Sequence, residues 1–205
     1  MIVFSILCLH FSYCEAFNVL FLYYSHSGVT KNTSHSIAEE IKLRPNIDVQ
    51  ATFKEISCPL DDGSFFTRAT NKLKTALSIR SINCTCEDIS FDSYDAVIFG
   101  SPIMGTTLPV FLEDTVAALP FSSFEGPVFY VSTGVTLTGT RASKKFSALT
   151  KVTPVKTLSI RKLIGASQND FLLSEFVGNV IGILTNPSKH SKTSAPAEHT
   201  PEAEL

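Results

Sequence analysis

The chain has 205 residues, of which 44% are hydrophobic and 18% charged, a composition that suits one globular domain with a full core. Its formal net charge of −2 argues against a nucleic-acid binder, which would carry a basic patch. Trp is absent and Phe occurs 16 times, so Phe, Leu, Ile and Val must supply the core volume.

The two ends differ from the middle. Residues 1–16 carry no charge before Glu15, and their apolar run is shorter than the roughly 20 residues of a membrane-spanning helix. Small residues at Cys14 and Ala16 resemble a signal-peptide cleavage site, although the basic start is missing. We interpret residues 1–16 as a signal peptide or apolar leader, 17–185 as the domain and 186–205 as a disordered tail. Cleavage would place the protein in the secretory pathway, and a misassigned start would leave it cytoplasmic.

Between the ends, apolar runs with the length of buried strands alternate with stretches that have helical spacing. Strands are expected at residues 18–24, 48–56, 95–102, 126–134 and 152–160. Helices are expected at residues 30–43, 66–78, 109–118, 141–149 and 171–184. This alternation predicts an α/β fold with a five-stranded parallel sheet between two helical layers.

Ligands of such sheets bind at the carboxyl ends of the strands, where the strand order reverses. Three predicted strand ends are rich in Gly and hydroxyl groups, and the first leads directly into a helix. A helix start offers unpaired N–H groups and partial positive charge, so it favours an anion such as phosphate. The candidate site residues are Ser25, His26, Ser27, Gly28, Val29, Thr30, Ser101, Pro102, Ile103, Met104, Gly105, Thr106, Ser132, Thr133 and Gly134.

The first of these loops, taken alone, could also be a simple helix cap, with Ser27 or Thr30 capping and Gly28 easing the turn. The matching loops on two further strands favour a ligand site. A dinucleotide fingerprint needs two more glycines than this loop holds, and Gly100 and Gly105 lack the Lys that a P-loop requires.

These residues resemble the flavodoxin-like family. The Ser-x-Ser-Gly-x-Thr loop is similar to its phosphate loop, residues 94–116 to its third strand and flavin loop, and residues 124–134 to its fourth strand and last flavin loop. The resemblance implies strand order 2-1-3-4-5 and FMN as cofactor, with the phosphate on residues 25–30 and the ring between the other two loops. Two departures concern affinity: Val29 replaces a common Asn, and Met104 lies where many relatives stack an aromatic ring.

Flavin supplies redox chemistry, so the resemblance implies a function without assigning a catalytic side chain. We favour an FMN-dependent reductase that uses NAD(P)H or a quinone. The alternatives are a one-electron carrier, which is typically strongly acidic around the flavin, and a flavodoxin-like binding domain without redox turnover. No nucleic-acid partner, metal site or transmembrane span is expected.

The remaining reactive residues carry less information. His26 is expected to act through its backbone, with its ring toward solvent, and His35 to lie on a solvated helix face. Cys58 can pair with Cys84 or Cys86 if the chain is secreted, but free thiols are an equal alternative. Two sequons, at Asn32 and Asn83, would be open to glycosylation in a eukaryotic secretory route.

Overall fold

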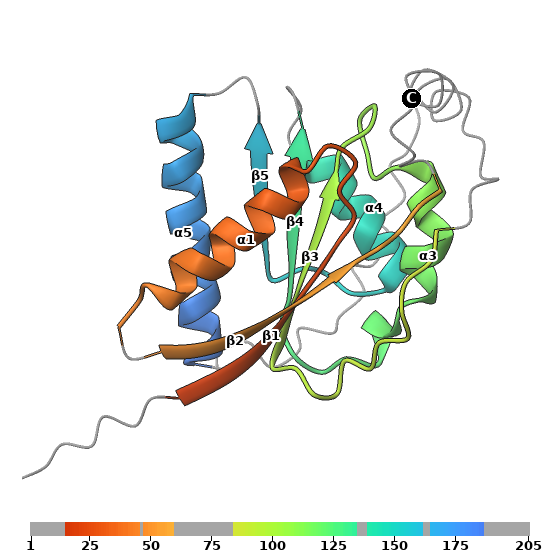
Figure 1. Cartoon of the computed structure of the whole chain (residues 1–205). Coiled ribbons are helices and arrows are strands. Elements are labelled where there is room, and N and C mark those ends of the chain that lie inside the picture. The colour runs from red at the N-terminus through yellow and green to blue at the C-terminus, as the bar shows by residue number, and fades with distance from the viewer. Residues whose placement is uncertain (1–14, 46, 60–83, 135–138, 162–164, 187–205) are drawn as a thin grey trace, which may run out of the picture.

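A computed structural model describes residues 15–45, 47–59, 84–134, 139–161 and 165–186. Their strands form one five-stranded parallel sheet in the order β2-β1-β3-β4-β5, with helices on both faces (Figure 1). The predicted fold class and strand order are thereby confirmed. The strands are β1 (Glu15–Tyr23), β2 (Ile47–Glu55), β3 (Ala96–Pro102), β4 (Val128–Gly134) and β5 (Lys156–Arg161).

Helices α1 (Val29–Lys42) and α5 (Ala166–Leu184) cover one face of the sheet, and α3 (Glu113–Ala118) and α4 (Thr140–Thr150) cover the other (Figure 1). Two short 3-10 turns, η1 (Val110–Leu112) and η2 (Pro120–Ser122), flank α3. Because both faces of the sheet are covered, the strands can be apolar throughout rather than alternating, and the first six residues of β3 and of β4 are all buried.

The two faces of the sheet belong to two separate cores. On the side of α3 and α4, an aromatic group that includes Phe99, Phe121, Tyr130 and Phe146 packs ring against ring, with centroids 5.0–6.0 Å apart. On the opposite side, the expected stripe of α5 is buried from Phe176 onward against β4 and β5. Among the described residues, eight Phe side chains are buried in these two cores, in a chain that has no Trp.

Several element boundaries differ from the sequence-based expectations. β1 begins at Glu15, three residues before the predicted start, because residues 15–17 pair with β2. β5 begins only at Lys156, after Pro154, which lacks a ladder donor. α5 begins at Ala166, before the predicted start at residue 171, because the polar residues 167–170 gave no apolar periodicity in the sequence. The predicted helix at 66–78 and tail at 186–205 fall outside the described residues, apart from Asn186.

Within the described ranges, no helix has both the length and the apolar character needed to cross a membrane.

Candidate functional site

The carboxyl ends of β1, β3 and β4 meet at one edge of the sheet. β1 and β3 are neighbours although β2 lies between them in sequence, so the strand order reverses at this point. The register pairs Tyr23 with Gly100 and Pro102 with Thr133, which brings the three predicted loops to the same edge. The site expected from sequence therefore forms one contiguous region in space.

The first loop ends in a helix N-terminus with free donors. Gly28 precedes α1 in the left-handed conformation, with φ of 79°. Among the described residues, the N–H groups of Gly28, Val29 and Thr30 have no hydrogen-bond acceptor. The next N–H group, that of Lys31, donates to Ser25 Oγ at 3.1 Å. This arrangement of unpaired N–H groups at the start of a helix suits an anion.

The side chains of this loop divide between solvent and core. His26 and Ser27 are exposed, and Val29 is 45% exposed. Thr30 is buried, and its Oγ1 lies 2.8 Å from Thr133 Oγ1 on β4. The Thr30 hydroxyl, expected as a phosphate donor, is thus already hydrogen-bonded inside the protein.

The second loop is held by β4 and by its own tight turn. Ile103 N donates to Thr133 O at 2.7 Å, and Met104 N donates to Thr107 O at 3.2 Å across Gly105, which has φ of 68°. Ile103 and Met104 are partly buried against the α3/α4 core, whereas Gly105 and Thr106 are exposed. The loop therefore presents backbone and an aliphatic face at the sheet edge.

The hydroxyl groups of two candidate site residues are turned into the protein. Ser101 is fully buried and its Oγ lies 2.8 Å from Tyr130 Oη. Ser132 is also buried, with its Oγ 2.9 Å from Ser159 Oγ and donating to Leu158 O. Their side chains stabilise the sheet, so any contribution to a ligand must come from their backbone. Gly134 and Pro102 are partly exposed at the strand ends.

Gly100 and Tyr130 contribute to the site but were missed in the sequence. A Cβ on Gly100 would lie 3.0 Å from Thr30 Cγ2 and 3.2 Å from Tyr23 Cβ, so Gly100 lets the start of α1 approach β3 closely. Tyr130 holds Ser101 in place, and burial raises the pKa of its phenol above the ordinary value near 10. A glycine at the end of an otherwise apolar strand was the available signal for Gly100.

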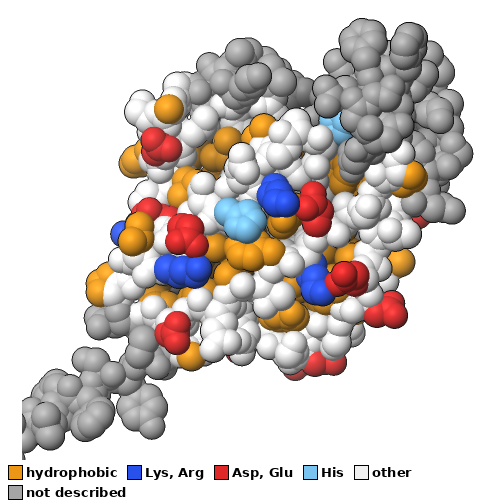
Figure 2. All heavy atoms as spheres, viewed as in Figure 1, with side chains coloured by type: hydrophobic (Ala, Val, Ile, Leu, Met, Phe, Trp, Pro, Cys, Tyr) orange, Lys and Arg blue, Asp and Glu red, His pale blue; other side chains and the backbone are white. Residues whose placement is uncertain are grey.

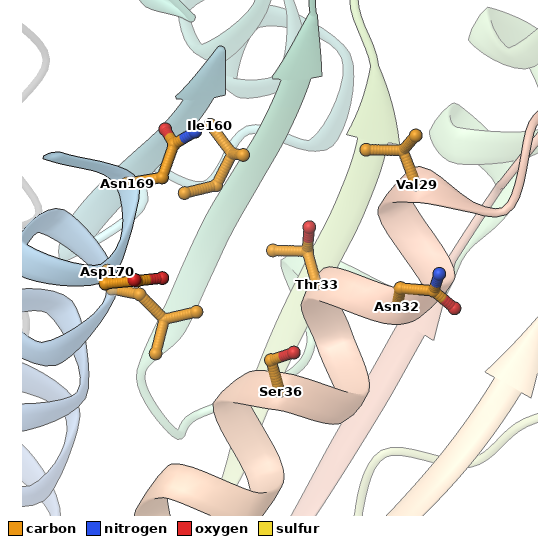
Figure 3. Close-up of a pocket in the computed structure, with 8 residues that line it drawn as sticks. Val29, Asn32, Thr33, Ser36, Ile160, Asn169 and Asp170 are labelled. Carbon is orange, nitrogen blue, oxygen red and sulfur yellow. The ribbon is translucent and has the colours of Figure 1, made fainter. Parts of the chain in front are cut away.

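A shallow pocket of about 250 Å³ lies beside the first loop, between α1 and α5. Figure 3 shows Val29, Thr33 and Ser36 of α1 facing Asn169 and other residues of α5 and β5 across it. Asn169 pairs through its side-chain amide with both backbone groups of Arg161. Of the three loops, only Val29 lines this pocket, so it adjoins the candidate site and does not coincide with it.

The electrostatic character of the site is close to neutral. The three loops contain no Asp, Glu, Lys or Arg. Lys31, which follows the first loop, forms an ion pair with Glu55 at 3.4 Å. Figure 2 shows acidic and basic side chains interspersed over the face that carries α1, rather than gathered by sign. His35 is exposed there, as expected, and stacks on Phe53 with centroids 4.0 Å apart.

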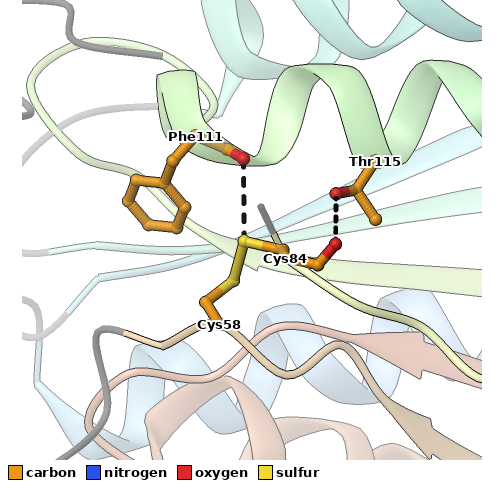
Figure 4. The surroundings of a disulfide bond; sticks show 4 residues. All are labelled: Cys58, Cys84, Phe111 and Thr115. Carbon is orange, nitrogen blue, oxygen red and sulfur yellow. Dashed lines mark hydrogen bonds between the residues drawn. A yellow bond between two sulfur atoms is a disulfide. The ribbon is translucent and has the colours of Figure 1, made fainter. Parts of the chain in front are cut away.

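A disulfide joins Cys58 to Cys84 on the face of the sheet that α3 and α4 cover (Figure 4). Cys58 follows β2, and Ser57 and Thr85 form an antiparallel bridge next to it. Cys84 is tied to the segment after the second loop, since Thr115 Oγ1 donates to its carbonyl at 3.2 Å. Cys86 is a free thiol, and partial burial raises its pKa. The pairing left open by the sequence is therefore Cys58 with Cys84.

Three solved structures with a similar fold are a flavoprotein and two putative flavoproteins. One is a putative flavoprotein from Bacteroides uniformis ATCC 8492, with TM-score 0.54 and 17% identity over 82% of this chain and 99% of that one. Another is a flavoprotein from Lactobacillus acidophilus NCFM in complex with FMN, with TM-score 0.53 and 17% identity over 70% and 93% of the two chains. A putative flavoprotein from Bacteroides eggerthii DSM 20697 has TM-score 0.53 and 11% identity over 82% and 98%. No family model and no curated protein matches the chain.

Proposed function

We propose that this chain, which has the flavodoxin-like fold, binds FMN at the carboxyl edge of its sheet. The observation that carries the proposal is the start of α1, where Gly28, Val29 and Thr30 offer N–H groups without acceptors at the β1/β3 reversal point. Flavodoxin holds FMN at the equivalent switch point of its sheet. A terminal phosphate fits this site because the donors are backbone groups and need no basic side chain.

The residues present fit the two parts of FMN unequally. For the phosphate, Ser27 adds an exposed hydroxyl to the backbone donors, and Gly28 lets the backbone approach closely. For the ring, the second loop offers the aliphatic side chains of Ile103 and Met104 beside Gly134. We therefore expect the phosphate to contribute much of the binding free energy, and the ring less than it would against an aromatic side chain.

FMN, when bound, supplies the redox chemistry. The chain's own residues would bind and orient FMN. The phosphate loop would hold the phosphate end, and the hydrogen bond from Ile103 N to Thr133 O sets the position of the second loop beside the ring. Because the described side chains of the three loops include no acid or base besides His26, no catalytic proton donor is proposed.

Among redox functions we propose a two-electron reductase that uses NAD(P)H or a quinone. A one-electron carrier gains partner affinity from acidic side chains around its flavin, and the three loops here contain none. The two alternative functions, a one-electron carrier and a binding domain without redox turnover, predict different outcomes in the same experiments.

Titration of the apoprotein with FMN, riboflavin and FAD, followed by flavin fluorescence, tests the binding proposal. We expect FMN to bind best, because riboflavin lacks the phosphate and the adenosine of FAD has no track in the site. Equal affinity for riboflavin and FMN would contradict the phosphate site. Quinone turnover with NAD(P)H then supports the reductase. A persistent one-electron form during stepwise reduction, without turnover, would indicate a carrier, and bound flavin with neither would indicate a binding domain.

A further inference from the structure

Thr133 of β4, in the third loop of the proposed site, contacts both the first and the second loop. The backbone oxygen of Thr133 accepts the hydrogen bond from Ile103 N at 2.7 Å, which holds the second loop. Its side-chain Oγ1 lies 2.8 Å from Thr30 Oγ1, which belongs to the first turn of α1. Thr133 is itself part of the third loop, so all three loops meet at this residue.

The contact with Thr30 spans the intervening strand. In the sheet, β3 lies between β1, which leads into α1, and β4. Gly100 of β3 occupies the gap beneath the start of α1, where a Cβ would come within 3.0 Å of Thr30 Cγ2. Because Gly100 has no side chain, Thr30 can lie against β3 and reach Thr133 on the next strand. The glycine and the two threonines therefore form one arrangement.

The threonine pair is isolated from water. Thr30 is 1% exposed and Thr133 is 4% exposed, and each Oγ1 has the other as its hydrogen-bond partner among the described residues. Removal of one hydroxyl would leave the other buried without a partner, which is less favourable than losing both. The pair thus gives the start of α1 one preferred position relative to β4.

We propose that Thr133 is a positioning residue that fixes the phosphate loop and the second loop in their mutual geometry, an inference that rests on the proposed FMN site. Its hydroxyl is paired with that of Thr30 inside the protein, so Thr133 would act by holding the N–H groups of Gly28, Val29 and Thr30 where the phosphate binds. Its effect should fall on the phosphate more than on the ring.

The test compares Thr133→Val, which removes the hydroxyl at nearly constant volume, with Thr133→Ser, which keeps it. Thr150→Val is a matched control, because Thr150 is equally buried. Its hydroxyl donates to Phe146 O at the C-terminal end of α4. We expect Thr133→Val to weaken FMN binding by about fivefold to tenfold, the equivalent of one buried hydrogen bond. Riboflavin binding should change by less, and Thr133→Ser and Thr150→Val should bind FMN within about twofold of the wild type.

A double variant and the apoprotein complete the test. Thr30→Val combined with Thr133→Val should bind FMN no more weakly than Thr133→Val alone, since the second change removes an already unpaired hydroxyl. In the apoprotein, exchange of the Asn32 amide, which donates to Gly28 O at 2.8 Å, should be faster in Thr133→Val than in Thr150→Val.

The outcomes separate the two proposals. If the wild type binds neither flavin, the FMN proposal fails, and amide exchange still decides whether Thr133 positions the loop. If FMN binds but Thr133→Val and Thr150→Val alter the FMN-to-riboflavin affinity ratio alike, the positioning role of Thr133 is overturned. Unchanged exchange of the Asn32 amide in Thr133→Val would overturn it as well.

Discussion

Replacement of Gly28 by Val perturbs the phosphate loop in two separable ways. Gly28 has φ of 79°, a left-handed conformation that costs a residue with a Cβ about 1–2 kcal/mol, and more for a β-branched one. Apart from its chain neighbours, no heavy atom of the described residues lies within 4 Å of the position that its Cβ would take, so this cost comes from the backbone and not from packing. Bound phosphate adds a second cost, because the new side chain would stand between it and the N–H groups.

A matched variant isolates the second cost. Gly105 also has a positive φ, 68°, and open space around its Cβ position, but it lies in the loop expected beside the ring. Gly28→Val and Gly105→Val should therefore lose similar stability, about 2 kcal/mol or somewhat more, and a drop in Tm of about 4–8 °C. Only Gly28→Val should lose the preference for FMN over riboflavin.

The size of that loss follows from the donors at stake. A hydrogen bond to a charged oxygen contributes about 1.5–3 kcal/mol, so displacement of one N–H group from the phosphate should weaken FMN binding by about tenfold or more. Ser27→Ala removes only an exposed hydroxyl and should cost less. Thermal unfolding and flavin titration of the three variants give both quantities. Normal FMN binding by Gly28→Val would show that the glycine is only a helix-cap residue.

Three further predictions concern stability and processing. Reduction of Cys58–Cys84, or Cys58→Ala with Cys84→Ala, should lower the free energy of unfolding by about 3–4 kcal/mol for a sequence separation of 26. Urea unfolding in a Cys86→Ala background measures this, and an unchanged unfolding midpoint would contradict it. Tyr130 has a raised pKa, so the unfolded state loses its proton first and stability should fall as pH rises above about 10; Tyr130→Phe should remove part of that pH dependence, and identical slopes for the two proteins would refute it. If residues 1–16 are a cleaved signal peptide, mass spectrometry of protein from its native cells should find an N-terminus at Phe17, whereas a retained Met1 rejects export, and a glycan on Asn32 together with bound FMN would contradict the placement of the phosphate loop.

The central strands were predictable from sequence because β1, β3 and β4 each contain a continuous apolar run, whereas β2 was found from its alternating pattern. β3 and β4 were found within two residues, and their order followed from the resemblance. The start of α5 could not be found in this way, because residues 167–170 are all polar and show no apolar periodicity. Cleavage before Phe17 would also remove the first two residues of β1, which the sequence placed outside the strand.

The candidate site was predicted as a region more accurately than as a set of side chains. Strand alternation places Ser101 and Ser132 on the same face as Phe99 and Tyr130, so their hydroxyls point into the α3/α4 core. Their residue type alone suggested ligand donors. The contact of Thr30 with Thr133 depends on the packing of α1 across Gly100, which no local pattern in the sequence encodes.

The disulfide also has a use in protein engineering. The Cα atoms of Cys58 and Cys84 are 4.2 Å apart, so the disulfide holds the two ends of the intervening segment next to each other. The length of the intervening segment is therefore decoupled from the spacing of β2 and β3. A binding peptide or a reporter domain whose own termini are close could be grafted between these two cysteines while the sheet and its loops keep their geometry. The segment between Cys58 and Cys84 is thus an insertion site whose two ends are joined by a disulfide.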